Sequence, residues 1–591
     1  MKTNDEFDYA IRGGNDVPAA CFLNSLAREC AAIQIINNQY EVYYRIPLGS
    51  TDEIQIPLNY VSSVGLHEYC FPAVLYAEES RAIGFEEVVE KILEQPALVG
   101  LITKEQKETF LERVNESYSN TYIGARNNPY STILFSEALN FQQAEQGLLI
   151  GHSFHPAPKS REQFSEEDAR KYSPELGGEF ALCWLVVDSS ILISGSSGEY
   201  NAKERLEQLV SQDHLLSLSL SGVIHEGEHL FPVHPWQWTV LQENEDIQSY
   251  IQSGLIRDLG EIGSTWYPTS STRSLYSPTL PYMLKFSLSV KLTNSIRNLS
   301  LKEVIRGTRL NQLFHDTELS NELGQEQGFQ VMQEPSYLGL TNKLGEVIDE
   351  SLVAFRDNPL SSKPEEEAVV LATLTQQNPY GGESLLAKRI KHYANSSQQS
   401  LSQVAEQWFS AYCQYTVIPL FNLQANYGLV FLAHQQNIVM QMKSGFPIGM
   451  YYRDCQGTGY TDLAFERFPE ALKQTKQDIE NYWNYDKVRR YFAYYLIINS
   501  TFNVIASISA YCGVSEQTLL QELRKQLEVL KAKGVRDTRC LDYVLESEAL
   551  CCKGNFYCYL QNMNENSIPD PSVIYFDLPN PLVHIKDAMN V

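Results

Sequence analysis

The spacing of hydrophobic residues divides the chain into three zones. In residues 1–148, apolar side chains recur at helical spacing between polar turns, and FEEVVEKILEQ (85–95) predicts a helix. Residues 149–365 are richer in strand-like patterns, whereas residues 366–591 are mostly helical. We therefore expect an α+β protein of several domains, with boundaries near residues 148 and 365.

Three apolar runs indicate where strands lie. FALCWLVV (180–187) ends in a polar turn, which is typical of a buried strand. MLKFSLSVKLT (283–293) alternates polar and apolar residues, as a half-buried antiparallel strand does. YGLVFLAHQQNIVMQM (427–442) interrupts the helical zone with a strand-like pattern. These runs predict an antiparallel sheet in the middle zone.

Two further segments bear on the surface and on membranes. DNPLSSKPEEEA (357–368) is rich in proline and charge, so it predicts a surface connection. The most apolar stretch, 493–510, is interrupted by Asn499, Ser500, Thr501 and Asn503. Such polar groups are poorly tolerated against lipid, so this stretch predicts a buried helix and no membrane span.

Composition narrows the classes of function. The chain has 591 residues, with 46 Lys and Arg against 72 Asp and Glu, so the formal net charge is 46 − 72 = −26. A surface this acidic repels phosphate backbones, which argues against nucleic-acid binding. It leaves room for small anionic ligands only if the cations gather in one place.

The cellular compartment is predicted from the N-terminus and the cysteines. The first residues, MKTNDEFDYAIRGGND, contain no apolar core of a secretory signal. The 11 cysteines include no C-x-x-C pair, and Cys551 and Cys552 are adjacent, which suits a reducing environment. We expect a cytoplasmic protein.

One familiar motif matches a known pattern but lacks the helix that the pattern requires. His225-Glu226-Gly227-Glu228-His229 matches the H-E-x-x-H of zinc proteases, which requires both histidines on one face of a helix. Gly227 and the nearby Pro232 favour a strand, a turn and a second strand instead. Walker A, G-x-G-x-x-G and G-x-S-x-G patterns are absent from the sequence, which argues against P-loop ATPases, dinucleotide enzymes and α/β-hydrolases.

Five polar clusters carry more information. The first is the proline-rich loop 151–161, which presents His152, His155, Lys159 and Arg161; a solvated basic loop is the alternative. The second, 232–238 (PVHPWQW), is equally compatible with a turn anchored by buried aromatic residues.

The third cluster brings together hydroxyl groups and cations suited to phosphate. Ser271 and Arg273 are followed by Lys285 and then by Thr293, Asn294 and Arg297. Arginine offers a planar fork to phosphate oxygens and lysine a point charge. Like parity on a strand places Lys285 and Thr293 on the same face. The alternative is a set of solvated surface cations.

The fourth and fifth clusters lie in the C-terminal zone. His434, Gln436 and Asn437 stand within an apolar run and are followed by Arg453-Asp454; amide and carboxylate oxygens of this kind suit Mg²⁺. A polar network without metal explains the same residues. Arg489-Arg490 on a predicted helix and Lys553 form the fifth, weaker cluster.

Together the five clusters resemble the IucA/IucC family of NRPS-independent siderophore synthetases. The resemblance rests on G-H-x-x-H-P-x-x-K-x-R (151–161), V-H-P-W-Q (233–237), S-x-R with the later Lys and T-x-x-x-R (271–297), H-x-Q-N with R-D (434–454), and Lys553 with N-P-L (580–582). These matches follow the family's order over about three quarters of the chain.

The resemblance implies a fold, a reaction and partners. The family fold is a cupped hand of thumb, fingers and a largely helical, distantly kinase-like palm, usually as a homodimer. Its enzymes use ATP to adenylate a carboxylate of citrate or a related acid, and then join it to an amine, such as a polyamine, an amino acid or a hydroxylamine. Pyrophosphate and AMP are released.

The resemblance also assigns roles to residues of this sequence. Ser271, Arg273 and Lys285 would hold the triphosphate, with His155 and Lys159 covering the nucleotide. Arg297 would lie between the α-phosphate and the substrate carboxylate, and together with Lys285 and His434 it would carry the catalytic roles. The acid would be bound by Thr293, Asn294, His434, Lys553 and one of Arg489 and Arg490, and Mg²⁺ by Gln436, Asn437 and Asp454. Six cations of these motifs would then line one cleft: Lys159, Arg161, Arg273, Lys285, Arg297 and Lys553.

The sequence departs from the family at two informative positions. Leu432 stands where the family commonly has Glu, and Tyr559 where it commonly has Arg. Loss of an acidic group at position 432 predicts weaker recognition of a cationic amine. Two other functions stay open at this stage: a kinase-like phosphotransferase built around Asn437 and Asp454, and a non-catalytic protein that binds citrate or a siderophore.

Overall fold

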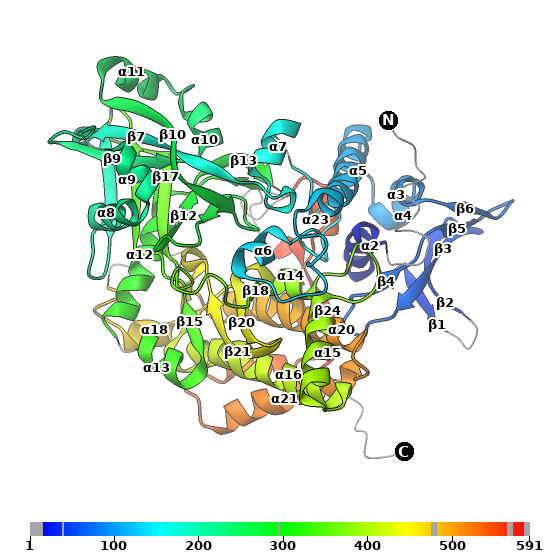
Figure 1. The fold of residues 1–591 in the computed structure, drawn as a ribbon. Helices are drawn as coiled ribbons and strands as arrows, with labels where there is room; N and C mark the ends of the chain where they lie inside the picture. The colour runs from blue at the N-terminus through cyan, green and yellow to red at the C-terminus, as the bar shows by residue number, and fades with distance from the viewer. Residues whose placement is uncertain are drawn as a thin grey trace.

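The N-terminal part is an antiparallel sheet covered by helices (Figure 1). The computed structural model describes residues 16–37, 41–161, 163–220, 222–292, 295–317, 319–473, 481–563 and 571–583. The strands pair in the order β1-β2-β3-β5-β6, with β4 beside β3. Their bounds are β1 (Gln34–Asn37), β2 (Val42–Leu48), β3 (Asp52–Tyr60), β4 (Glu68–Tyr69), β5 (Ala73–Tyr76) and β6 (Arg81–Ile83).

In the described residues up to Asn127, the helices beside this sheet are α2 (Val17–Glu29), α3 (Phe85–Leu93), α4 (Pro96–Val99) and α5 (Lys104–Asn127). The helix predicted over 85–95 is confirmed by α3, which buries Val88, Val89 and Ile92. The short α23 (Phe556–Leu560) from the far end of the chain joins the same core, with the rings of Phe22 and Phe556 5.3 Å apart.

An eight-stranded antiparallel sheet forms the middle part, in the order β8-β16-β17-β12-β11-β10-β7-β9. Its strands are β7 (Phe180–Asp188), β8 (Leu192–Ser196), β9 (Glu228–Val233), β10 (Ile256–Pro268), β11 (Ser274–Tyr276), β12 (Tyr282–Phe286), β16 (Ser336–Thr341) and β17 (Val347–Asp357). The helices around it are α6 (Phe141–Gln146), α7 (Glu166–Tyr172), α8 (Ala202–Gln212), α9 (His214–Ser219), α10 (Pro235–Leu241), α11 (Glu245–Ser253) and α12 (Leu301–His315). The next helix, α13 (Leu319–Gln327), packs instead against β15 (Phe329–Val331) in the core of the C-terminal part.

The buried strand predicted over 180–187 is confirmed by β7, and the antiparallel sheet by the strand pairing. The prediction of a half-buried strand over 283–293 is wrong. All five residues of β12 are buried, because β12 pairs with β11 on one side and β17 on the other. The chain then leaves this sheet, and β13 (Leu288–Leu292) forms a hairpin with β14 (Ser295–Arg297).

The H-E-x-x-H segment is a turn followed by β9. The carboxylate of Glu228 accepts a hydrogen bond from the backbone of His225 at 2.8 Å and pairs with Arg257 at 2.7 Å. The two histidines therefore do not share a helix face, as expected. The strand predicted before the turn is not formed, since helix α9 precedes it and ends at Ser219.

The C-terminal part is mostly helical. It contains α14 (Leu371–Thr375), α15 (Leu385–Ser397), α16 (Leu401–Tyr412), α17 (Ile418–Asn422), α18 (Asp462–Arg467), α19 (Tyr485–Lys487), α20 (Phe502–Ser509), α21 (Glu516–Ala532) and α22 (Arg539–Glu546). A four-stranded sheet in the order β15-β21-β20-β18 joins it to the middle part, with β15 (Phe329–Val331), β18 (Ala368–Val370), β20 (Ile438–Lys443) and β21 (Phe446–Tyr452).

Two strand pairs complete the C-terminal part, β19 (Leu429–Val430) with β22 (Gly459–Tyr460), and β23 (Ala549–Lys553) with β24 (Tyr575–Pro579). β19 and β20 account for the strand-like run predicted over 427–442. The segment 357–368 connects β17 to β18, as predicted. All 11 cysteines are free.

Among the described residues, one helix, Tyr485–Ser509, is long and apolar enough to cross a membrane. However, 89% of its most apolar window is buried inside the protein. This confirms the buried helix predicted over 493–510. The helix includes a π-helical stretch, Tyr494–Thr501, whose wider turn changes which side chains face the interior.

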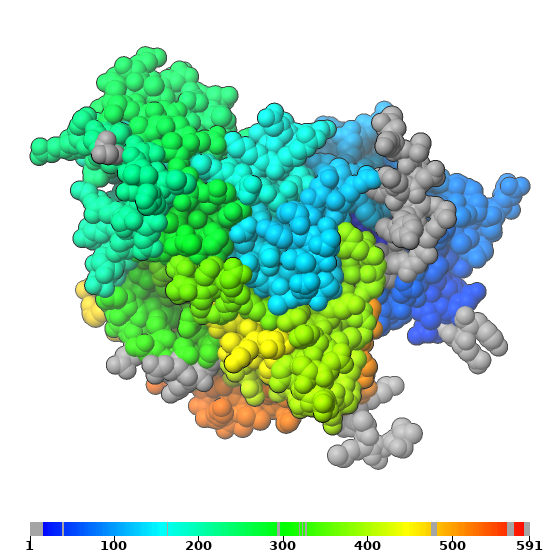
Figure 2. Space-filling model, in the orientation of Figure 1, coloured from blue at the N-terminus to red at the C-terminus, as the bar shows by residue number. Residues whose placement is uncertain are grey.

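The segment that contains α6 and the loop 148–161 lies between the N-terminal part and the eight-stranded sheet (Figure 2, cyan). Three large buried hydrophobic clusters accompany the three parts. The domain boundaries near residues 148 and 365 stay a prediction.

Candidate functional site

A cavity of about 430 Å³ lies where the middle and C-terminal parts meet the loop 148–161. Eleven of the residues singled out from the sequence line it: His155, Lys159, Ser271, Arg273, Lys285, Arg297, His434, Gln436, Asn437, Asp454 and Lys553. Arg161 lines it as well, so all six cations expected in one cleft are brought together.

Four predicted residues are not placed there. Thr293 and Asn294 lie outside the described residues. Arg489 and Arg490 do not line the cavity; their guanidinium groups lie 5.5 Å from the ring of Tyr543 and 5.4 Å from the ring of Tyr575. The geometry therefore offers no support for a role of either arginine in binding the acid.

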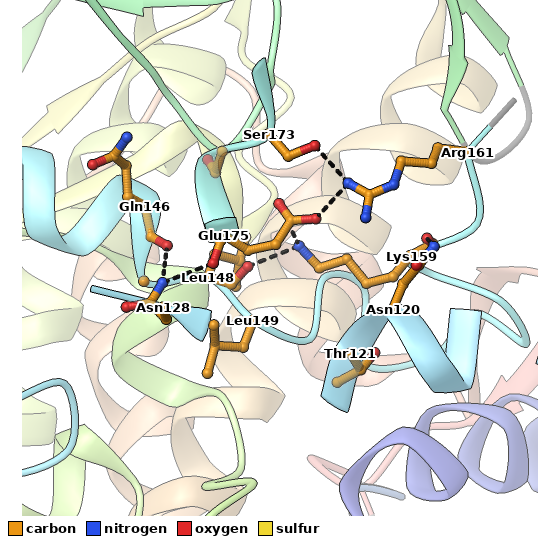
Figure 3. Close-up of polar contacts among 12 residues, drawn as sticks. Asn120, Thr121, Asn128, Gln146, Leu148, Leu149, Lys159, Arg161, Ser173 and Glu175 are labelled. Carbon is orange, nitrogen blue, oxygen red and sulfur yellow. Dashed lines mark hydrogen bonds and ion pairs between the residues drawn. The ribbon is translucent and has the colours of Figure 1, made fainter. Parts of the chain in front are cut away.

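A buried carboxylate, Glu175, organises the cations of the proline-rich loop (Figure 3). Its oxygens lie 3.5 Å from Lys159 Nζ and 3.0 Å from an Arg161 nitrogen. Lys159 also donates to the carbonyl of Leu148 at 2.8 Å, and Arg161 to the hydroxyl of Ser173 at 2.5 Å. Burial lowers the pKa of Lys159, and Glu175 opposes that shift by favouring the ammonium form.

The same loop rests on Tyr559. The Tyr559 hydroxyl lies 2.7 Å from the Ser160 hydroxyl, and its ring centroid lies 4.7 Å from that of His155. The residue that departs from the family pattern therefore supports the loop by packing and a hydrogen bond. Leu432, the other departure, does not line the cavity and packs against the C-terminal core. The predicted effect of Leu432 on amine recognition stays a prediction.

The turn between β10 and β11 has a constrained backbone. Thr272 has a φ of +64°, which is uncommon for a residue other than glycine and is expected mainly at functional sites. The Ser271 hydroxyl accepts from the backbone of Ser274 at 3.2 Å. Arg273 donates to the carbonyls of Arg297 and Asn298 at 2.9 and 3.2 Å, which joins this turn to β14.

Lys285 is the most deeply placed of the predicted lysines. It stands on β12 with its side chain 4% exposed, and its Nζ lies 2.7 Å from Asp454 and 3.6 Å from Glu334. Glu334 also holds Arg356 at 2.6 Å. Burial by itself would raise the pKa of Asp454, but Lys285 and Arg356 outweigh it and hold that pKa well below its usual range. Asp454 is therefore an anion, at a backbone φ of +82°.

Two further groups have shifted pKa values. Burial lowers the pKa of His434 to about 4, so its imidazole is neutral near pH 7. Burial and the nearby Arg273 lower the pKa of Arg297 to about 10, which still leaves the guanidinium charged near pH 7. The cavity thus combines a cluster of cations with the neutral imidazole of His434 and the carboxylates of Glu175 and Asp454. Because the cations outnumber the carboxylates, the arrangement is suited to binding polyanions.

Sequence reasoning missed several residues of the site. Arg356, Tyr494, Tyr495, Asn499 and Asn555 also line the cavity, the two tyrosines and Asn499 from the π-helical stretch. The buried carboxylates Glu145, Glu175 and Glu334 were missed as well, because no local sequence pattern marks them. His152 and Arg453 line the cavity too, and the sequence named both as motif residues without assigning them a role.

Comparisons with known proteins identify the family of this chain. The model of the IucA / IucC family matches residues 140–376, and a model described as a ferric iron reductase FhuF-like transporter matches residues 406–568. The N(2)-citryl-N(6)-acetyl-N(6)-hydroxylysine synthase of Vibrio mimicus is 60% identical, over 98% of this chain and 97% of that protein. The synthase of the same name from Escherichia coli is 40% identical, over 97% and 98%.

A solved structure is similar over nearly its whole length. The ATP-bound aerobactin synthetase IucA from Klebsiella pneumoniae has a TM-score of 0.89 and 40% identity, over 96% of this chain and 99% of that one. Fold and site therefore define a mixed helix-and-sheet protein of the siderophore synthetase class. The chain belongs to the IucA/IucC family.

Proposed function

We propose that this protein is an ATP-dependent ligase of siderophore biosynthesis that joins citrate to an amine through an amide bond. The observation that carries the proposal is the single cavity that gathers Lys159, Arg273, Lys285, Arg297 and Lys553 in a chain of net charge −26. Cations concentrated against such an overall charge are suited to ATP and a tricarboxylate. The relatives that act on citrate support the same reaction.

The amine is inferred from the names of two similar relatives. Both named N(2)-citryl-N(6)-acetyl-N(6)-hydroxylysine synthases match almost the whole chain, whereas the spermidine-citrate ligase of Bacillus anthracis is 32% identical over 77% of it. We therefore assign N(6)-acetyl-N(6)-hydroxylysine as the amine, acylated at its N2 nitrogen. Polyamines become the secondary expectation.

The first chemical step is adenylation. A citrate carboxylate oxygen attacks the α-phosphorus of ATP, and pyrophosphate leaves. Ser271, Arg273 and Lys285 hold the triphosphate, and His155 and Lys159 cover the nucleotide. Arg297 stabilises the charge that develops between the α-phosphate and the carboxylate. The enzyme supplies no nucleophile of its own, so it acts by aligning and neutralising anions.

The second step is amide formation. The amine nitrogen attacks the carbonyl carbon of the acyl-adenylate, and AMP leaves with the former carboxylate oxygen. His434, neutral because it is buried, can accept a hydrogen bond from the hydroxyl of citrate at one ring nitrogen or donate one to a carboxylate from the other, and Lys553 can pair with a second carboxylate. Thr293 and Asn294 are also assigned to the binding of citrate, on the family resemblance alone.

Magnesium fits the donor set. Gln436, Asn437 and Asp454 offer two amide oxygens and one carboxylate, which are hard ligands, and all three line the cavity. When bound there, Mg²⁺ would neutralise phosphate oxygens and orient the triphosphate. Asp454 would then be shared between the metal and Lys285. Within the described residues, no group of three or more His, Cys, Asp or Glu side chains is placed to hold a metal ion. A magnesium site here would therefore depend on the amide oxygens and on the phosphates of ATP as well as on Asp454.

The remaining family features are part of the proposal. They are the cupped-hand arrangement with a distantly kinase-like palm, a homodimer and a cytoplasmic location. The test of function is a screen of carboxylic acids for ATP-dependent pyrophosphate release, followed by mass spectrometry with candidate amines. Citrate-dependent release of pyrophosphate and AMP supports the ligase; release of ADP would identify a phosphotransferase instead.

A further inference from the structure

A buried carboxylate, Glu145, connects two walls of the cavity that come from distant parts of the chain. It stands on α6, with its side chain 1% exposed. One oxygen accepts from the backbone and the hydroxyl of Ser270, at 2.8 and 2.7 Å. The other lies 2.8 Å from a guanidinium nitrogen of Arg453, whose side chain is 3% exposed.

Arg453 extends this connection to the amide and carboxylate residues. Its Nε donates to the carbonyl of Gln436 at 2.9 Å, and another of its nitrogens donates to the Ser270 hydroxyl at 3.2 Å. The Gln436 side-chain nitrogen donates to the same hydroxyl at 3.2 Å. Arg453 also directly precedes Asp454, which has a left-handed backbone conformation.

Ser270 extends the connection in the other direction. It directly precedes Ser271 and the left-handed Thr272 in the turn between β10 and β11. A left-handed threonine is costly unless its surroundings hold it in place. The Glu145 carboxylate supplies such a constraint on this turn, because it fixes both the backbone and the side chain of Ser270.

We propose that Glu145 is a positioning residue that fixes the spacing between the phosphate-binding turn 270–273 and the segment that carries Gln436, Asn437 and Asp454. The proposal rests on the proposed function, because it assigns those two segments to the triphosphate and to Mg²⁺. Glu145 touches neither ligand. It acts through Ser270 and Arg453, so its loss loosens both sites at once.

A purely structural role makes a different prediction, and the chain offers a matched control. Glu367 and Arg389 form a second buried pair, with oxygen–nitrogen distances of 2.7 and 3.1 Å. Glu367 also accepts from a backbone nitrogen, that of Gly445, at 3.0 Å. Neither residue lines the cavity. If Glu145 only stabilises the fold, Glu145→Gln and Glu367→Gln should have the same consequences.

A purely electrostatic role of Glu145 predicts that Glu145→Gln changes the binding of Mg²⁺ and the binding of ATP in opposite directions. Glu145→Gln leaves the Arg453 cation without its carboxylate, which by charge alone repels Mg²⁺ and attracts ATP. Loss of positioning weakens the binding of both. Binding of ATP without metal therefore separates the two explanations.

The experiment measures ATP binding by calorimetry in EDTA, the Mg²⁺ dependence of citrate-driven pyrophosphate release, and the melting temperature. We expect Glu145→Gln to weaken ATP binding about tenfold and to raise the Mg²⁺ needed for half-maximal rate. Glu367→Gln should lower the melting temperature and leave both ligand readouts within about twofold of wild type. Ser270→Ala should weaken ATP binding with a melting temperature near that of wild type.

Two results would overturn the proposal. One is ATP binding by Glu145→Gln that is unchanged or tighter; the other is Ser270→Ala with wild-type affinity, which decides the matter if Glu145→Gln does not fold. A wild-type protein that releases no pyrophosphate with any acid would refute the proposed function alone, because the binding comparison in EDTA does not depend on turnover.

Discussion

Replacing Lys285 by methionine tests whether a cation of the cavity stabilises the folded protein through its buried ion pairs. Methionine keeps an unbranched side chain of similar length and removes the ammonium group. In the structure this group lies 2.7 Å from Asp454 and 3.6 Å from Glu334. Lys285→Met therefore leaves Asp454 without its closest cation.

The magnitude can be worked out from burial. Removing one partner of a buried ion pair costs about 3–5 kcal/mol. Here Glu334 keeps Arg356 at 2.6 Å, and the Asp454 side chain is 35% exposed, so water screens part of the loss. We therefore expect the free energy of unfolding to fall by about 2–3 kcal/mol.

Urea unfolding without nucleotide, near neutral pH, measures this difference. Lys171→Met is the matched control, because Lys171 pairs with Glu261 at 2.9 Å while both side chains are well exposed. Its loss should cost about 0–1 kcal/mol. If Lys285→Met destabilises the protein no more than Lys171→Met, then Lys285 is an ordinary solvated cation and the reasoning fails.

Three other predictions concern the reaction and its pH dependence. Arg297→Ala and His434→Ala should each reduce citrate-dependent pyrophosphate release at least about 100-fold while circular dichroism stays unchanged; substantial activity in both would contradict the assigned roles. Chelation of Mg²⁺ by EDTA should abolish pyrophosphate release, and restored Mg²⁺ should recover it; release that persists in EDTA would exclude a metal requirement. Burial lowers the pKa of His434 to about 4, so the unfolded chain binds a proton that the folded protein excludes between about pH 6.5 and pH 4. The free energy of unfolding should therefore fall as the pH falls through this range. Measured in urea, it should fall less between pH 7 and pH 5 in His434→Gln than in the wild type. Equal losses would show that His434 does not contribute to the pH dependence.

The sequence predicted the elements whose pattern is local. Helix α3, strand β7 and the buried helix over 493–510 were recognisable because periodicity and apolar runs report burial directly. The cations of the cavity were recognisable because each stands within a motif of proline, glycine or hydroxyl residues. The scarcity of positive charge suggested that cations would gather, and the resemblance to the IucA/IucC family implied that these ones share a cavity.

What the sequence could not show are partners that lie far away along the chain. Lys285 looked like the polar face of a half-buried strand because its partner, Asp454, is 169 residues away. Glu145 and Arg453 are separated by 308 residues, so the sequence around one gives no indication that it pairs with the other. One of Arg489 and Arg490 was assigned to the acid from the family resemblance, but their guanidinium groups lie against the rings of Tyr543 and Tyr575.

The central claim is that a citrate carboxylate becomes an acyl-adenylate. It is tested most directly by running the reaction with ATP, N(6)-acetyl-N(6)-hydroxylysine and citrate labelled with ¹⁸O in its carboxyl groups, and weighing the nucleotide product by mass spectrometry. Adenylation transfers one carboxylate oxygen to phosphorus, so the account predicts AMP that carries a single ¹⁸O, formed together with the amide. Unlabelled AMP, or ADP as the nucleotide product, would contradict it.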